Sequence, residues 1–419
     1  MFMPEFYVAP GRLMAAPRAS RDNVRMNLRE PLALLGGLSP AAFMRDVWQK
    51  KPMLIRNALP LVGDGGAPLA PVTAAQLFEL ASRDDVESRI VIQDAGDAKP
   101  RARAKARAPA ADGWQLKHGP FARRALPPLS QRGWTLLVQG ADLHAQAAHD
   151  LLQRFRFVAD ARVDDLMISY ASPGGGVGAH IDSYDVFLLQ VHGHRRWRVG
   201  PVDDASIVDG LPVRILEHFQ PTDEWVLAPG DMLYVPPRWG HDGVAEDECM
   251  TCSIGFRTPM GTELARELLQ RVLDDVETDA DEPHFRDPPR SATDTPARMP
   301  AALDAFARKA VDRLLKDPSQ LARALGEVMT EPKPQVWFDT GLERGAGAGL
   351  RLDRRTRMMY DERHVFINGE SFNAAGRDAA LMRELADARQ LAAAQCRKLS
   401  ADAQAVVADW VAQGWAHDD

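Results

Sequence analysis

Cysteine is scarce in this sequence, with three residues among 419. Three thiols cannot build the disulfide framework that stabilises many small secreted domains. Cys249 and Cys252 form a CxxC pair, a spacing that also occurs in zinc and redox sites. A zinc site would need a second pair of ligands, and none lies near by in the sequence. We therefore interpret CMTCSIGF as a β-strand that carries two structural thiols.

Long apolar runs and a strong charge of one sign are also missing. No segment reaches the roughly 18 consecutive apolar residues of a membrane-spanning helix. The N-terminal segment lacks an apolar stretch followed by a small-residue cleavage site. We therefore expect a cytoplasmic protein without membrane contact. The net charge of −7 argues against non-specific coating of nucleic acid, although an acidic protein would attract a basic protein substrate.

The length and the apolar fraction of 45% predict two or three globular domains. Residues 1–30 show no periodicity and are expected to form a flexible extension. Residues 31–258 contain helices with Ser39 and Thr73 as N-caps, then short strands separated by glycine and proline, which is typical of a jelly-roll β-barrel. Within them, residues 94–113 are basic and rich in alanine and proline. We favour a solvated insertion there over an RNA-contacting loop.

Helical periodicity replaces the strand pattern after residue 258. Residues 259–317 contain two amphipathic helices joined by an acidic, proline-rich stretch. Residues 318–419 are predicted to form a small domain in the order helix, strand, strand, helix, helix. Its last two helices are not strongly basic, so we expect a scaffolding or protein-contact role without direct DNA binding.

The segment SYASPGGGVGAHIDSYDVFLLQVHGHRRWRVG holds the main candidate site. In a strand, residues i and i+2 point to the same face, so His180 and Asp182 can bind one ion together. A second imidazole, His241, follows in PPRWGH at the end of another apolar strand. Two histidines and one carboxylate form the ligand set of non-haem Fe(II) oxygenases, which leaves positions free for a co-substrate and dioxygen.

Several longer motifs resemble one known family. DDLMISYASPGGGVGAHIDSYDVFLLQVHGHRRWRVG, LAPGDMLYVPPRWGHDGVA and CSIGFRTP are similar to the JmjC-type cupin core of the bacterial ribosomal oxygenases, and VWQKKPMLIRNALP and WQLKHGPF resemble its entry segment. The resemblance covers most of residues 36–260. It implies a mainly β fold with added helices, in which a double-stranded β-helix precedes a helical dimerisation segment (259–317) and a winged-helix-like domain (318–419).

The resemblance also implies a co-substrate and its ligands. The family binds Fe(II) through the positions of His180, Asp182 and His241, and it uses 2-oxoglutarate together with O2. Its anchoring arginine corresponds to Arg195, and a serine near the co-substrate corresponds to Ser169. A guanidinium suits bidentate pairing with the far carboxylate of 2-oxoglutarate. Strand alternation predicts that Arg196, next to Arg195, faces solvent.

The substrate implied by the resemblance is an arginyl residue of large-subunit ribosomal protein sixteen, hydroxylated at its 3-position. A guanidinium entering the site would need polar and aromatic partners at the barrel mouth. Asp185, Gln190 and Gln139 are candidates for polar contacts, and Tyr184 is a candidate for stacking.

Two alternatives to a protein hydroxylase remain at this stage. One is a metal-dependent cupin enzyme that acts on a small metabolite, which the additional helical and winged domains argue against. The other is a non-catalytic ribosome-associated cupin, which the complete set of His180, Asp182, His241 and Arg195 argues against.

Overall fold

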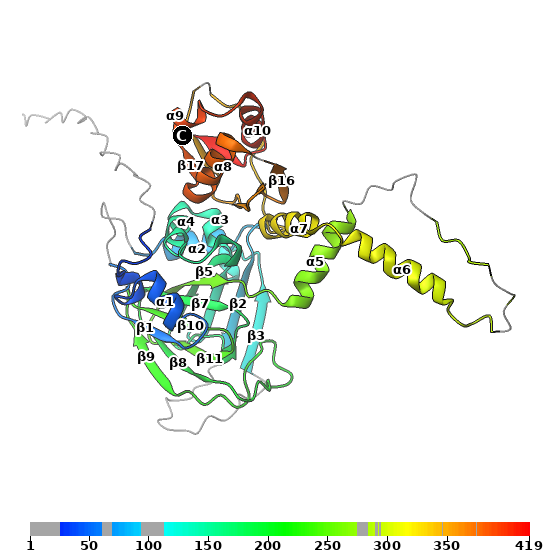
Figure 1. The fold of residues 1–419 in the computed structure, drawn as a ribbon. Coiled ribbons are helices and arrows are strands. Elements are labelled where there is room, and N and C mark those ends of the chain that lie inside the picture. The colour runs from blue at the N-terminus through cyan, green and yellow to red at the C-terminus, as the bar shows by residue number, and fades with distance from the viewer. Residues whose placement is uncertain are drawn as a thin grey trace, which may run out of the picture.

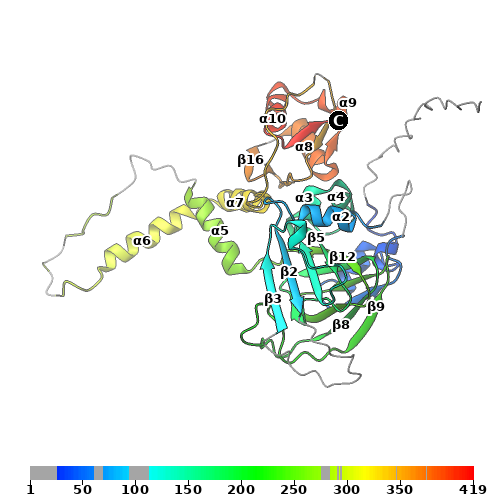
Figure 2. The ribbon, with the colours of Figure 1, turned by 180° about the vertical axis from the view of Figure 1, so that it is seen from behind.

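The protein consists of a barrel, a helical arm and a small C-terminal domain (Figures 1 and 2). The computed structural model describes residues 26–60, 69–93, 113–274, 284–289, 292, 295–345, 347–373 and 375–419. The first 25 residues of the predicted extension and residues 94–112 of the predicted basic insertion lie outside these ranges. The barrel contains strands β1–β12, and the arm contains helices α5 and α6.

Two antiparallel sheets form the barrel. The first has the order β1 (Met53–Ile55), β10 (Met232–Val235), β7 (Asp185–His192), β12 (Cys249–Phe256), β5 (Val163–Ala171), β4 (Trp134–Val138), β2 (Ser88–Gln93) and β3 (Trp114–His118). The second has the order β6 (His180–Ile181), β11 (Trp239–Ala245), β8 (Arg195–Pro201) and β9 (Asp223–Leu227). This arrangement confirms the predicted jelly roll, in which a layer of side chains lies between two sheets.

Strand β7 shows why the barrel sequence is apolar almost without interruption. Phe187 and Leu189 pack into the core beneath the helices, whereas Val186 and Leu188 pack into the core shared with β8 and β9. Both faces of the central strand are therefore buried, so the simple alternation of polar and apolar residues disappears. Phe187 belongs to a buried aromatic cluster with Phe43 and Tyr234.

Short helices cover the outer face of the larger sheet. They are α1 (Pro40–Asp46), α2 (Ala74–Leu80), α3 (Ala141–His144) and α4 (Gln146–Gln153). The predicted N-caps are confirmed. The side chain of Ser39 accepts a hydrogen bond from the Ala42 N–H at 3.2 Å, and Thr73 forms a capping box with Gln76. The CxxC interpretation is confirmed as well, because Cys249 and Cys252 are buried, unbonded residues of β12.

The C-terminal domain begins with α7 (Pro318–Thr330) and has its own apolar core around Leu385, Trp410 and Ala416. Its strands form two small sheets, β17 (Gln390–Leu391), β13 (Leu350–Leu352) and β18 (Ala416–Asp418), and β14 (Met358–Tyr360), β15 (His364–Ile367) and β16 (Glu370–Asn373). Its remaining helices are α8 (Gly376–Ala388), α9 (Ala393–Cys396) and α10 (Ala401–Ala412). The sequence predicted two strands in this domain, whereas the structure has six. The others were missed because strands of two to four residues are too short to show a clear period.

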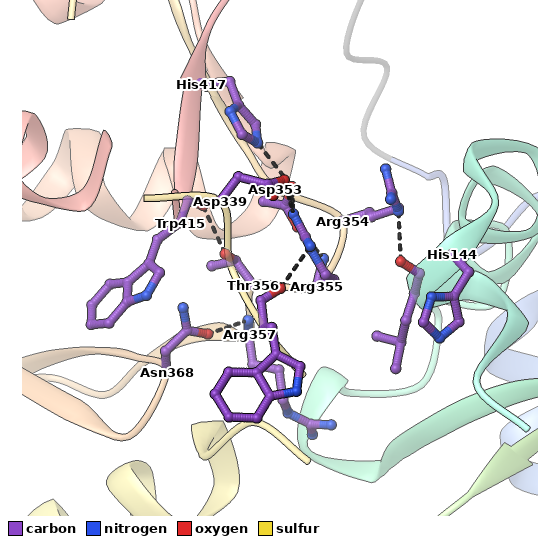
Figure 3. Close-up of polar contacts among 12 residues, drawn as sticks. His144, Asp339, Asp353, Arg354, Arg355, Thr356, Arg357, Asn368, Trp415 and His417 are labelled. Atoms are coloured by element: carbon purple, nitrogen blue, oxygen red, sulfur yellow. Dashed lines mark hydrogen bonds and ion pairs between the residues drawn. The ribbon is translucent and has the colours of Figure 1, made fainter. Parts of the chain in front are cut away.

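Polar contacts attach the C-terminal domain to the barrel. Lys333 lies 3.1 Å from a carboxylate oxygen of Asp164 and 3.1 Å from one of Asp165, at the beginning of β5. Arg354 donates a 2.7 Å hydrogen bond to the Leu143 carbonyl oxygen, beside His144 at the end of α3 (Figure 3). Asp165 is buried, so Lys333 supplies the counter-charge that this carboxylate needs.

The helical arm stands away from the barrel (Figures 1 and 2). α5 (Gly261–Asp274) buries Val272, and its Arg271 forms an ion pair with Glu331, the residue that follows α7. α6 (Ala301–Leu314) buries none of its residues. None of the helices in the described ranges is long and apolar enough to span a membrane.

Candidate metal centre and co-substrate pocket

The pairing of two strands places the predicted histidines side by side. β6 runs antiparallel to β11 with His180 directly opposite His241, and their ring centroids lie 4.2 Å apart. Asp182 follows β6 immediately, and its carbonyl oxygen accepts a 2.9 Å hydrogen bond from the N–H of Arg238. Arg238 has a φ of 67° in the tight turn that leads into β11. This turn fixes Asp182 beside the histidine pair.

The three side chains converge as the sequence predicted. One potential ligand atom from each lies within 4.8 Å of the others. Nε2 of His241 is 3.4 Å from a carboxylate oxygen of Asp182, and Nε2 of His180 is 3.9 Å from the other. Among the described residues this is the one cluster of three or more such groups. Two imidazole nitrogens and one carboxylate oxygen on one side of a small space fit Fe(II) with open coordination positions.

Backbone carbonyls fix the orientation of both imidazoles. Nδ1 of His180 donates to the Gly178 carbonyl oxygen at 2.9 Å, and Nδ1 of His241 contacts the Trp239 carbonyl oxygen at 3.3 Å. Because a carbonyl can only accept, each Nδ1 carries the proton and each Nε2 presents its lone pair to the shared space.

The charges of these groups also suit a divalent cation. Burial lowers the pKa of His180, and the neighbouring His241 lowers it further, which favours the neutral imidazole that a metal requires. Burial alone would raise the pKa of Asp182, but its interactions with His241, His180 and Tyr184 outweigh it and hold this pKa below its usual value. Asp182 is therefore an anion beside the neutral His180.

Arg195 lies inside the barrel without a carboxylate partner among the described residues. It is 3% exposed, and burial lowers its pKa. Its guanidinium donates to the Ser169 hydroxyl at 3.4 Å and to the Gly243 carbonyl at 3.1 Å, and it packs over Trp197 at 4.9 Å. Its Nε has no hydrogen-bond partner. A buried cation with a free donor is costly, so this pocket fits the carboxylate of a bound acid.

The alternation predicted for β8 is confirmed. Arg196 points outward and pairs with Glu224 and Glu246, each at 2.5 Å. Arg195, Trp197 and Val199 point inward, opposite Ala245, Gly243 and His241 of β11. The arginine and the second histidine therefore face the same interior space.

The four residues predicted to contact the substrate differ in their surroundings. Tyr184 is 39% exposed and interacts with the Asp182 carboxylate. Asp185 is fully buried and accepts hydrogen bonds from Tyr234, Gln49 and Arg162.

The two glutamines also have partners within the protein. Gln190 is fully buried, accepts a 2.9 Å hydrogen bond from the Thr251 hydroxyl and donates to the His192 carbonyl. Gln139 lies 3.5 Å from Asp165. Of the four side chains, Tyr184 has the most exposed surface for an incoming side chain, and the roles of all four stay predictions.

Sequence reasoning missed three residues of the pocket. Thr251 lies opposite Ser169 across β5 and β12 and next to Gln190 across β7. Trp197 and Gly243 were likewise not among the candidate site residues. The inward parity of β8 and β11 would have identified Trp197 and Gly243, since they lie two residues from Arg195 and His241.

Comparisons with known proteins agree with this geometry. Residues 150–264 match the JmjC domain family, and residues 313–417 match the ROXA-like winged helix family. The chain is 37% identical over 226 residues to a probable ribosomal oxygenase of Haemophilus influenzae, an alignment that spans 53% of this chain and 50% of that protein. It is 32% identical over 304 residues to the ribosomal protein uL16 3-hydroxylase of Escherichia coli, spanning 70% of this chain and 72% of that protein.

Solved structures of the Escherichia coli ribosomal oxygenase YcfD share the whole architecture. One, in complex with cobalt and 2-oxoglutarate, superimposes with a TM-score of 0.72 at 27% sequence identity, covering 91% of this chain and 98% of that one. A second has a TM-score of 0.75 at 27% identity, covering 90% of this chain and 98% of that chain. The C-terminal domain is accordingly a winged helix, as predicted. Fold, site geometry and sequence similarity together show that the chain belongs to the JmjC-type bacterial ribosomal oxygenases.

Proposed function

We propose that this protein is an Fe(II)- and 2-oxoglutarate-dependent dioxygenase that hydroxylates an arginyl residue of ribosomal protein uL16 at its 3-position. One observation carries the proposal. A facial set of two histidines and one aspartate opens into the same interior as a buried arginine that has no carboxylate partner among the described residues. The relative from Escherichia coli is named for 3-hydroxylation of uL16, which supports the substrate.

Separate residues of this site would bind the metal and the co-substrate. His180, Asp182 and His241 would hold the iron, which when bound supplies the activation of dioxygen and the oxidation of a C–H bond. Arg195 and Ser169 would hold the far carboxylate of 2-oxoglutarate, which fixes the angle at which its oxo-acid end meets the metal ligands. The burial of Arg195 would strengthen this pairing, because the effective dielectric constant of the interior is low.

The partly exposed Tyr184 would contact the substrate. Its side chain hydrogen-bonds to the Asp182 carboxylate and is 39% exposed, which supports a role for the ring in stacking on the guanidinium of an incoming arginine. Asp185 and Gln190 would then act mainly by shaping the site, because their polar groups already have partners within the protein. Gln139 would keep its side-chain oxygen for a contact, because this buried atom has no hydrogen-bond partner among the described residues. A basic ribosomal protein also suits a chain with a net charge of −7, and such a substrate would place the enzyme in the cytoplasm.

The helical arm would form a homodimer. α6 buries no residue, and the exposed apolar side chains on the arm include Leu269, Leu273 and Val311. An amphipathic helix with an unburied apolar stripe is stable only when another surface covers that stripe. A second copy of the same arm offers a matching surface by two-fold symmetry.

The winged helix would act as a scaffold. α10 carries Asp402 and Asp409 and no basic residue, which is unsuited to a phosphate backbone. Lys333, Arg354 and Arg357 instead hold the domain against the barrel.

Incubation of the purified protein with uL16, Fe(II) and 2-oxoglutarate tests the proposal. We expect succinate release and a mass gain of one oxygen atom on a single arginine-containing peptide of uL16, with neither seen in Asp182→Ala. Turnover of a small metabolite without 2-oxoglutarate would instead indicate a different cupin enzyme. Ribosome binding without any turnover would indicate a non-catalytic factor.

A further inference from the structure

Gly243 of β11 lies directly against the Arg195 guanidinium. It is two residues from the proposed metal ligand His241, and across the sheet it stands directly opposite Trp197. Its carbonyl accepts the 3.1 Å hydrogen bond from Arg195. The six-membered ring of Trp197 lies over the space that a side chain at this position would occupy.

A single methyl group at Gly243 would collide with both neighbours. A Cβ built there lies 2.7 Å from Nε of Arg195 and 2.7 Å from Cη2 and Cζ3 of Trp197. Both neighbours lie in the interior, with Arg195 3% and Trp197 5% exposed, so neither can avoid the collision by turning into solvent. The guanidinium is also held in place by Ser169 and by the backbone of Gly243 itself.

The backbone does not explain the glycine. Gly243 is absent from the glycines with positive φ, so an L-amino acid could adopt its backbone conformation. The close approach of the two side chains is therefore the reason that a glycine is needed here.

We infer that Gly243 is a positioning residue that sets where Arg195 presents its guanidinium, and that it thereby makes the site selective for a 2-oxo acid with a second carboxylate. The inference rests on the proposed function. With a methyl group at this position, Nε and the whole planar guanidinium must shift by several tenths of an ångström, and the bidentate geometry with a carboxylate is lost. The three atoms nearest to the added Cβ belong to Arg195 and Trp197 and none to His241, so we expect the proposed metal ligands to keep their places.

Calorimetric titration of Gly243→Ala, loaded with catalytically inert Ni(II), tests this inference. Two probes are compared: 2-oxoglutarate, which needs both the metal and Arg195, and oxalate, which chelates the metal alone. We expect the affinity for 2-oxoglutarate to fall roughly tenfold to a hundredfold, the usual range for one overpacked methyl group, with oxalate unchanged. Gly255→Ala is the matched control, because a Cβ at this buried strand glycine meets nothing closer than 3.9 Å.

The outcomes separate the inference from the proposed function. Unchanged 2-oxoglutarate binding in Gly243→Ala would overturn the inference, and so would an equal loss of both probes. Failure of the wild-type protein to bind 2-oxoglutarate would overturn the proposed function instead. If Gly243→Ala does not fold, the same comparison is made between Trp197→Phe and Trp197→Phe/Gly243→Ala, in which the smaller ring removes one of the two collisions. The double variant Trp197→Phe/Gly243→Ala is still expected to bind 2-oxoglutarate more weakly than Trp197→Phe.

Discussion

Replacing Arg195 with methionine should weaken ligand binding strongly while changing the stability of the ligand-free protein only slightly. The guanidinium is buried, has no carboxylate partner among the described residues, and leaves Nε without a hydrogen bond. In the free protein it is an uncompensated buried charge, and replacing such a group by an apolar one of similar size is neutral or stabilising by about 1–4 kcal/mol. The hydrogen bonds to Ser169 and Gly243 are lost in return, at about 1 kcal/mol each. We therefore expect the free energy of unfolding of Arg195→Met to stay within about 2 kcal/mol of wild type.

Binding of 2-oxoglutarate should fall much further. Removing one partner of a buried, hydrogen-bonded ion pair costs about 3–5 kcal/mol, which corresponds to at least a hundredfold loss of affinity at about 1.4 kcal/mol per factor of ten. Urea denaturation with and without 2-oxoglutarate in the presence of Ni(II) measures both effects. At a ligand concentration of about 100 times the wild-type Kd, the wild-type protein should gain about 2.7 kcal/mol, and the variant almost nothing.

Two results would refute this reasoning. An equal gain in stability for wild type and variant would mean that the far carboxylate binds elsewhere. A large loss of stability in the ligand-free variant would mean that Arg195 is a structural residue whose charge is already satisfied. Arg196→Met is the matched control, because this neighbouring arginine faces outward and pairs with two surface glutamates, so neither ligand binding nor stability should change by much.

Three further predictions concern other parts of the molecule. Asp182→Ala should abolish tight metal binding while the fold persists, since only two neutral imidazoles remain; elemental analysis after dialysis and thermal denaturation check the two parts. Burial and the charges of Arg389 and Arg354 lower the pKa of His149 to about 3. Between about pH 6.5 and pH 3 the unfolded chain therefore binds a proton at His149 that the folded protein does not bind, and the folded protein loses stability as the pH falls through this range. His149→Leu should remove this contribution, so its stability relative to wild type should improve from pH 7 to pH 4 by up to about 1.4 kcal/mol per pH unit; urea titrations at each pH would contradict the assignment if the difference stayed constant. Leu273→Glu combined with Val311→Glu should dissociate the proposed dimer without unfolding the barrel, and sedimentation that shows an unchanged mass would rule out this face.

The convergence of the three proposed metal ligands was predictable because strand geometry is regular. His180 and Asp182 share a face through the period of two, and the same parity separates the inward Arg195 from the outward Arg196. His241 could be assigned from its position after a proline turn that ends an apolar strand. These inferences need only local rules, together with the family resemblance that joined the distant histidine to the pair.

The sequence could not predict the role of residues that depend on how distant strands pair. Whether Asp185 faces a substrate or the interior depends on Gln49 and Arg162, which approach it from distant parts of the chain. The sequence gives no indication that both will donate to the same carboxylate. Gly243 is similar, because its importance comes from Trp197 lying opposite across the sheet. The small C-terminal sheets were undercounted for another reason, since strands of two to four residues with interspersed arginines carry little periodic signal.

Strand β5 connects the contact with the winged helix to the proposed co-substrate site, two regions that are far apart in the sequence. At its start, Asp164 and Asp165 are neutralised by Lys333 of the winged helix, and four residues later the same strand presents Ser169 to Arg195. Cutting the chain ahead of Lys333 would therefore remove the counter-charge of Asp164 and Asp165 at the beginning of the strand that carries Ser169. Substitutions at the contact between the winged helix and the barrel, far from the proposed metal ligands, should therefore weaken co-substrate binding.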